Sequence, residues 1–121
     1  MNRILYVDDE PDIREIALLA LSLDPALEVR AAAGGAEAIR IMADWMPDLV
    51  LLDVMMPEMD GPATLVRLRE DPRTAVVPVV FITARAQPTE MQTFATLDAR
   101  GVIAKPFDPV TLAQLVRGFL A

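Results

Sequence analysis

Three acidic side chains stand at positions where short apolar runs end. Asp8 and Asp9 follow the apolar residues 4–7, and Asp53 follows the apolar residues 49–52. Carboxylates brought close together either raise one another's pKa or hold a cation, and clustered hard oxygens suit Mg²⁺, with Mn²⁺ as the alternative ion. An Asp-Asp pair alone is more often a solvated loop end or a helix cap. Asp53 favours the cation site, because a charge that ends so apolar a run is poorly placed to be a casual surface residue.

Two further polar residues end apolar runs of the same kind. Thr83 follows residues 76–82, and Lys105 follows residues 102–104. Lys105 is the only lysine beside ten arginines, and its compact ammonium could follow a moving phosphoryl oxygen where a planar guanidinium would not. Each residue alone has an ordinary explanation, since threonine favours strands and a single lysine can stand anywhere. Their repeated position at the ends of runs predicts that they converge on one shared site.

The chain alternates between runs of strand length and stretches of helical length. Runs that are apolar at every position suit strands covered on both faces, whereas residues 27–31 alternate apolar and charged residues, as a half-exposed edge strand does. Proline, glycine and aspartate mark the helix starts. The predicted strands are residues 4–7, 27–31, 49–52, 76–82 and 102–104. The predicted helices are residues 13–23, 36–45, 63–69, 87–97 and 110–120.

Five strand-helix units with the second strand at an edge predict an α/β fold. The expected architecture is a flavodoxin-like, doubly wound (βα)5 fold with a parallel five-stranded sheet of order 2-1-3-4-5. In such a sheet the ligand crevice lies outside the carboxyl ends of the strands, at the switch point between the first and third strands. The topology therefore predicts that the residues ending the apolar runs meet at this crevice.

The composition restricts the classes of protein to which the chain can belong. Its 121 residues are 54% hydrophobic, which suffices for the core of one domain spanning residues 1–121. A net charge of −7 opposes direct binding to nucleic acid or to anionic membranes. Without cysteine or histidine there is no disulfide framework and no usual zinc ligand set. No segment has the pattern of a signal peptide or a membrane span, so we expect a cytoplasmic protein.

Two motifs carry a resemblance to a known family. They are Asp53-Val54-Met55-Met56-Pro57-Glu58-Met59-Asp60-Gly61 and Lys105-Pro106-Phe107. In order and spacing the chain resembles bacterial two-component response-regulator receiver domains, chemotaxis regulators of a single domain among them, from residue 4 to the last predicted helix. The resemblance implies a signalling domain rather than an enzyme, one that assists its own phosphorylation and dephosphorylation.

The resemblance also implies a partner and a metal. Asp53 would accept a phosphoryl group from a histidine kinase or a histidine phosphotransfer protein. Asp53, Asp9 and the backbone carbonyl of Met55 would ligate Mg²⁺, and Asp8 would help through water. Thr83 and Lys105 would bind the phosphoryl oxygens. The peptide before Pro106 is similar to one that is cis in the family.

The sequence departs from the family's pattern in the residues that transmit the signal. Receivers often carry tyrosine or phenylalanine three residues before the lysine, whereas this chain has Val102, so the usual aromatic switch is not expected. Thr83, Val102, Met91 and Phe94 fall on the expected switch and output face, which would bind an unknown downstream protein. Met91 and Phe94 also have the helical spacing of core residues. We expect phosphorylation to move the segment after Thr83 instead.

Two other functions remain alternatives. A flavodoxin-like metal-dependent phosphatase would use the same crevice, but the chain lacks a glycine-rich phosphate loop after the first strand. Asp8-Asp9-Glu10 also does not form the Asp-x-Asp motif of the haloacid dehalogenase family. A receiver-like interaction module that is never phosphorylated is opposed by the complete set of acidic, hydroxyl and lysine residues.

Overall fold

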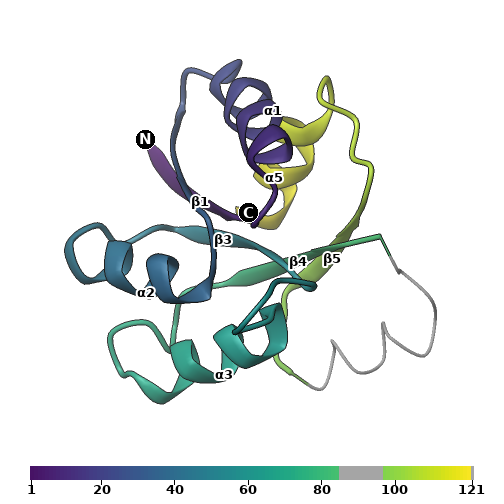
Figure 1. The fold of residues 1–121 in the computed structure, drawn as a ribbon. Helices are drawn as coiled ribbons and strands as arrows, with labels where there is room; N and C mark the ends of the chain where they lie inside the picture. The colour runs from purple at the N-terminus through teal and green to yellow at the C-terminus, as the bar shows by residue number, and fades with distance from the viewer. Residues whose placement is uncertain (85–96, 121) are drawn as a thin grey trace.

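The computed structural model describes residues 1–84 and 97–120, which form one parallel sheet with helices on both faces (Figure 1). The strands are β1 (Asn2–Val7), β2 (Leu27–Ala32), β3 (Leu49–Asp53), β4 (Val79–Thr83) and β5 (Gly101–Ala104). The helices in the described residues are α1 (Pro11–Ser22), α2 (Gly35–Asp44), α3 (Gly61–Glu70) and α5 (Leu112–Leu120). The strand order is β2-β1-β3-β4-β5, so the predicted flavodoxin-like topology is confirmed, with β2 at an edge.

The sheet has an apolar core on each face. One face packs against α2 and α3 and includes Leu52 and Phe81, and the other packs against α1 and α5 and includes Leu51 and Ile82. Successive side chains of a strand point to opposite faces, so a strand covered on both faces must be apolar at almost every position. This explains why every residue of β3 and β4 is buried. Within the described residues, none of the helices is long and apolar enough to cross a membrane.

The predicted start of the fourth strand was wrong by three residues. Residues 71–77 form turns and leave Val76 84% exposed. Pro78, which has no N–H to donate to a sheet, precedes the first residue of β4, Val79. Apolar composition alone did not separate the turn from the strand.

The last helix also starts later than predicted. Asp108 accepts a hydrogen bond from the N–H of Val110 at 2.9 Å and holds a turn ahead of α5, which begins at Leu112. The aspartate therefore caps a turn instead of the helix itself. The predicted helix over residues 87–97 lies, except for its last residue, outside the described residues.

The start of α3 presses closely against the end of β3. Asp60 caps the helix, because its side chain accepts a hydrogen bond from the N–H of Ala63 at 2.8 Å. A Cβ atom on Gly61 would lie 2.5 Å from the backbone oxygen of Asp53 and 2.8 Å from the Cα atom of Val54. No side chain fits at residue 61 unless the backbone moves, so Gly61 sets the distance between α3 and the residue that ends β3.

Gly61→Ala is expected to lower the free energy of unfolding by about 1–3 kcal/mol, because overpacking forces the backbone to shift. The matched control is Gly118→Ala in α5, where a Cβ would have no atom within 4 Å and alanine improves helix propensity by up to about 1 kcal/mol. Urea unfolding followed by the fluorescence of the single, buried tryptophan, Trp45, measures both variants. A neutral effect of Gly61→Ala would contradict the close approach.

Candidate functional site

The polar residues predicted from the sequence lie at the carboxyl ends of the strands. Neighbouring strands are in register there, because Asp53 pairs with Ile82 and Thr83 pairs with Ala104. The parallel sheet therefore places these residues at one edge, as predicted. Asp8 and Asp9 follow β1, Asp53 ends β3, Thr83 ends β4 and Lys105 follows β5.

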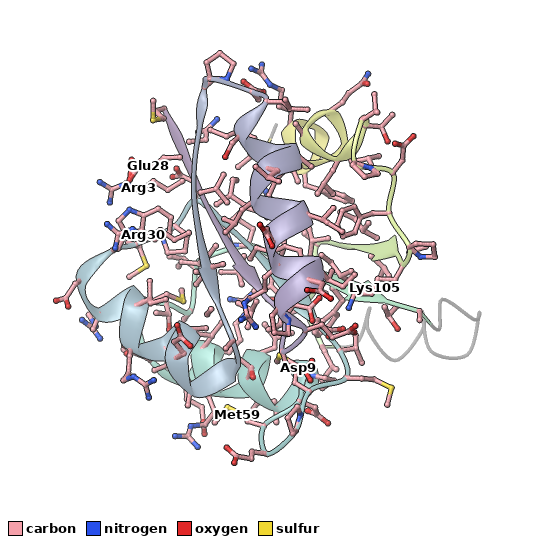
Figure 2. All side chains as sticks on the ribbon, turned by 45° about the horizontal axis from the view of Figure 1, so that its top comes forward. Arg3, Asp9, Glu28, Arg30, Met59 and Lys105 are labelled. Atoms are coloured by element: carbon pink, nitrogen blue, oxygen red, sulfur yellow. The ribbon has the colours of Figure 1, made fainter. Side chains whose placement is uncertain are left out.

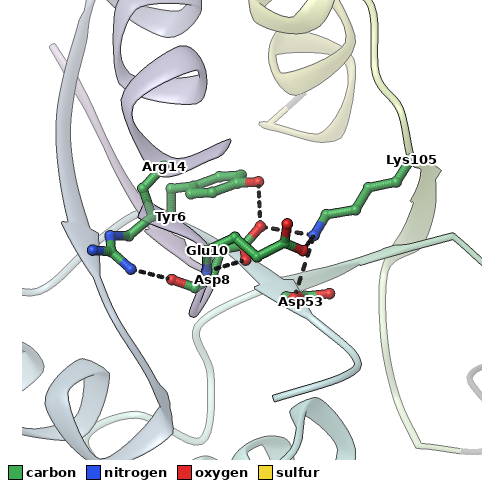
Figure 3. A network of polar contacts seen from close by, with 6 residues as sticks. All are labelled: Tyr6, Asp8, Glu10, Arg14, Asp53 and Lys105. Carbon is green, nitrogen blue, oxygen red and sulfur yellow. Dashed lines mark hydrogen bonds and ion pairs between the residues drawn. The ribbon is translucent and has the colours of Figure 1, made fainter. Parts of the chain in front are cut away.

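Lys105 makes the central contacts of this edge (Figure 3). Its Nζ lies 2.8 Å from Oδ2 of Asp8, 3.3 Å from Oδ2 of Asp53 and 3.6 Å from Oε1 of Glu10. Burial by itself would lower the pKa of Lys105, but the hydrogen bond to Asp8 and the charge of Asp53 outweigh it and raise that pKa. The lysine is therefore charged at neutral pH and compensates the carboxylates around it.

Asp8 is fully buried, and both of its carboxylate oxygens accept hydrogen bonds. Oδ1 accepts from the backbone N–H of Glu10 at 3.0 Å, and Oδ2 accepts from the hydroxyl of Tyr6 at 3.0 Å as well as from Lys105. Arg14 of α1 donates to the backbone carbonyl of Asp8 at 2.8 Å. A buried carboxylate is tolerated when it is paired in this way, and the pairing also fixes its orientation.

Asp53 is 4% exposed, and its negative charge is disfavoured where it stands. Burial raises the pKa of Asp53, and the charge of Asp8 raises it further, whereas Lys105 and the backbone N–H of Met55 lower it, so that the pKa is about 6. At neutral pH the side chain is mainly an anion in a site that would gain stability from an added positive charge. Such a carboxylate is suited to hold a cation and to act as a nucleophile.

A cation fits among the acidic side chains of this edge. One oxygen each from Asp8, Glu10 and Asp53 lie within 4.8 Å of one another. Opposite oxygen ligands of Mg²⁺ lie about 4.2 Å apart at its usual bond length, so small side-chain movements would let these oxygens share an ion. Glu10 was missed in the sequence, because a glutamate after an Asp-Asp pair has no distinguishing pattern. The only available signal was its position in the same loop as Asp8.

Two of the expected metal ligands are not in this set of oxygens. Asp9 is half-buried, and Figure 2 shows it near the same end of the sheet as Lys105, away from Arg3. Met55 has an exposed side chain, and its backbone N–H forms a hydrogen bond with the carboxylate of Asp53. The roles of Asp9 and of the Met55 carbonyl remain predictions.

Thr83 is buried at the end of β4, and its backbone carbonyl accepts a hydrogen bond from the N–H of Lys105 at 2.8 Å. The threonine and the lysine are thus held side by side by this hydrogen bond and by the pairing of β4 with β5. The peptide between Lys105 and Pro106 is cis, as the resemblance implied.

Val102, where the family often has an aromatic ring, is partly buried and pairs with Phe81 on β4. The two residues pack in the core between the sheet and the α2–α3 layer. The other expected members of the switch and output face, Met91 and Phe94, lie outside the described residues.

A largely apolar groove of about 330 Å³ opens beside Lys105. It lies between α1 and the loop that leads to α5. Ile13 and Ile16 of α1 line one side, Phe107 and Pro109 line the other, and Glu10 stands with Lys105 where the groove meets the acidic site.

Known sequences similar to this chain include members of the family that the sequence motifs resemble. The response regulator receiver domain family matches residues 4–117. Response regulator Rre1 of Synechocystis sp. is 39% identical over 118 residues, which cover 98% of this chain and 51% of that protein. A probable cyclic di-GMP phosphodiesterase of Vibrio cholerae is 38% identical over 103 residues, which cover 85% of this chain and 23% of that protein. The chain spans about half, or less, of the length of these relatives.

Comparison with solved structures gives the same result. The chemotaxis protein CheY4 of Vibrio cholerae has a TM-score of 0.90 at 30% identity, with 98% of each chain covered. The receiver domain of a signal transduction histidine kinase from Syntrophus aciditrophicus has a TM-score of 0.85 at 32% identity, covering 99% of this chain and 90% of that one. Because sequence and fold agree along nearly the whole chain, we conclude that it belongs to the response-regulator receiver domains of two-component systems.

Proposed function

We propose that this receiver accepts a phosphoryl group on Asp53 from a phosphohistidine of a histidine kinase or a histidine phosphotransfer protein, in a reaction that requires Mg²⁺. The observation that carries the proposal is the position of Asp53. Its carboxylate is buried at the carboxyl edge of the sheet, with the ammonium of Lys105 3.3 Å away and two further acids close enough to share a cation.

The chemistry needs little more than this arrangement. A carboxylate oxygen of Asp53 attacks phosphorus, the phosphorus–nitrogen bond of the phosphohistidine breaks, and the imidazole leaves with the electron pair of that bond. Lys105 shifts from Asp53 to a phosphoryl oxygen, and the hydroxyl of Thr83 donates to another. Positioning and charge neutralisation supply most of the catalysis in phosphoryl transfer.

Bound Mg²⁺ would neutralise charge between the acids and the transferred group. Asp8, Glu10 and Asp53 offer oxygens close enough to hold it, and the family resemblance adds Asp9 and the Met55 carbonyl. The raised pKa of Asp53, about 6, means that the nucleophilic anion predominates above that pH.

The apolar groove beside Lys105 supports a protein as the phosphoryl donor. Ile16 and Leu19 of α1, with Leu23 directly after the helix, are exposed and recur at helical spacing, and Ile16 also lines the groove. An exposed apolar stripe beside a groove that reaches Lys105, the partner of the reactive carboxylate, is suited to an apolar face on a partner protein. We infer that the phosphohistidine partner docks on α1 and the loop before α5.

Mg²⁺ is expected to raise the melting temperature of the protein. An ion at ten times its dissociation constant adds about 1.4 kcal/mol to the free energy of unfolding, which corresponds to about 5 °C for a domain of this size. Thermal melts at increasing millimolar Mg²⁺ measure the effect. Glu10→Gln is expected to reduce it, whereas Glu70→Gln, an exposed acid at the far end of α3, serves as the matched control. An unchanged midpoint in wild type would remove the metal from the proposal.

The experiment that tests the function is intact mass after incubation with acetyl phosphate, with Mg²⁺ or with chelator. We expect the mass of one phosphoryl group to be added only with Mg²⁺. A chain whose mass never changes would instead be an interaction module of receiver shape.

A further inference from the structure

Tyr6 is a fully buried polar residue at the edge of the acidic site. It stands on β1, two residues before Asp8, and is the only tyrosine of the chain. Strand side chains alternate between faces, so Tyr6 and the residue two positions later lie on the same side of the sheet. A buried phenol requires a hydrogen-bond partner, and the Tyr6 hydroxyl donates to Oδ2 of Asp8 at 3.0 Å (Figure 3).

The same oxygen of Asp8 also accepts from Lys105, at 2.8 Å. Oδ2 is therefore shared between a neutral donor from β1 and the ammonium that contacts Asp53. The other oxygen, Oδ1, is held by the backbone N–H of Glu10. The carboxylate of Asp8 is thus fixed at both oxygens, and its orientation in turn fixes one contact of the lysine.

The Tyr6 hydroxyl donates its one proton to Asp8. Burial and the negative charge of Asp8 raise the pKa of Tyr6 far above its ordinary value. The phenol is therefore neutral at neutral pH, and its oxygen carries no charge that would compete with a carboxylate for a cation.

The ring of Tyr6 is held from two sides. It belongs to the core between the sheet and the helices α1 and α5, and its ring meets that of Phe107 edge to face, with centroids 6.4 Å apart and an interplanar angle of 73°. Phe107 also lines the apolar groove beside Lys105. Packing therefore aims the hydroxyl at Asp8 with little freedom to turn away.

We propose that Tyr6 is a positioning residue of the phosphoryl-accepting site: its hydroxyl orients Asp8 for the cation and, through the shared oxygen, places Lys105 beside Asp53. The part of this proposal that concerns phosphoryl transfer rests on the proposed function. The part that concerns cation binding does not.

Tyr6→Phe keeps the ring and its packing while it removes the hydroxyl. We expect the Mg²⁺ dissociation constant to rise about tenfold, and the rate of phosphorylation by acetyl phosphate to fall about tenfold, as is typical when a residue that orients a metal ligand is lost. The matched control is Thr74→Val, which removes another buried hydroxyl, bonded to the carbonyl of Leu68 at 2.6 Å. This control is expected to bind Mg²⁺ and accept phosphoryl groups at wild-type levels.

A second readout uses the single tyrosine directly. In wild-type protein labelled with ¹³C at the ζ carbon of tyrosine, one signal reports the hydroxyl's environment, and we expect it to move as Mg²⁺ saturates the site. Wild-type Mg²⁺ affinity in Tyr6→Phe, or a tyrosine signal that does not respond to Mg²⁺, would overturn the proposal. If wild type binds Mg²⁺ but gains no phosphoryl group, the proposed function fails while the Mg²⁺ affinities still decide the role of Tyr6.

Discussion

Asp53→Asn is expected to raise the free energy of unfolding by about 3 kcal/mol at pH 8 in metal-free buffer. The pKa of Asp53 is about 6 in the folded protein and about 3.9 in an unfolded chain, and each unit of difference corresponds to about 1.4 kcal/mol. Because the folded-state pKa is the higher one, the charged form destabilises the fold above pH 6. Asparagine removes that charge and keeps the shape of the side chain.

The gain from Asp53→Asn should depend on pH in one direction. It should be nearly complete at pH 7 and above and shrink as the pH falls through 6 toward 4, because protonation then removes the charge from wild type as well. Urea unfolding at pH 8 and at pH 4.5, followed by Trp45 fluorescence, should show the gain fall from about 3 kcal/mol to about 1 kcal/mol. Destabilisation at pH 8 would mean that the contact with Lys105 outweighs the effects of burial and of Asp8.

Lys105→Met is expected to lower the free energy of unfolding by about 3–5 kcal/mol at pH 8, because it removes the positive partner of buried carboxylates and leaves them uncompensated. The lysine is 14% exposed and contacts three acids, two of them buried. Urea unfolding without metal gives the size of the loss. Mg²⁺ in the same experiment should restore part of it, since the ion then carries the missing positive charge.

Lys105→Arg is the control that separates charge from geometry. It should keep most of the stability, because the positive charge remains. The planar guanidinium cannot take the place of the compact ammonium beside Asp53, so the changes in amide chemical shift caused by phosphorylation should differ from those in wild type. A fully stable Lys105→Met would contradict the central role of the lysine. Identical phosphorylation-induced shift changes in Lys105→Arg and wild type would show that the geometry of the ammonium is not required.

Much of the site could be predicted because strand ends coincide with changes of polarity. Asp53 and Thr83 each end a run of residues that are buried on both faces of the sheet, so a single polar residue at the end of such a run stands out. A parallel sheet then places these ends at one edge whatever the sequence of the helices. The prediction needed only the strand order, which followed from placing the second strand, with its alternating apolar and charged residues, at an edge of the sheet.

Tyr6 and Glu10 could not be assigned from the sequence for a different reason. The ring of Tyr6 is apolar enough to fit a strand run, so its hydroxyl gives no signal until its distance to Asp8 is known. Glu10 is an exposed loop residue, and only the bend after β1 turns its carboxylate toward Lys105. Both roles depend on side-chain orientation, which periodicity does not encode.

The start of β4 was misplaced for a third reason. Val76 and Val77 continue the apolar run of the strand, yet Arg69 donates to the carbonyl of Val77 at 2.8 Å and thereby supports a turn at these residues. Local composition favoured a strand, whereas neither the contact from α3 nor the effect of Pro78 on the strand start is visible in apolar composition.

The measurement that tests the account most directly is the location of the phosphoryl group. Borohydride reduces an aspartyl phosphate to homoserine, and tandem mass spectrometry of the digested chain then identifies the residue. After incubation with acetyl phosphate and Mg²⁺ we expect homoserine at residue 53, and none in samples treated with chelator or in Asp53→Asn. An unmodified Asp53 under these conditions, or homoserine at Asp8 or Asp9 instead, would contradict the assignment of Asp53 as the phosphoryl acceptor.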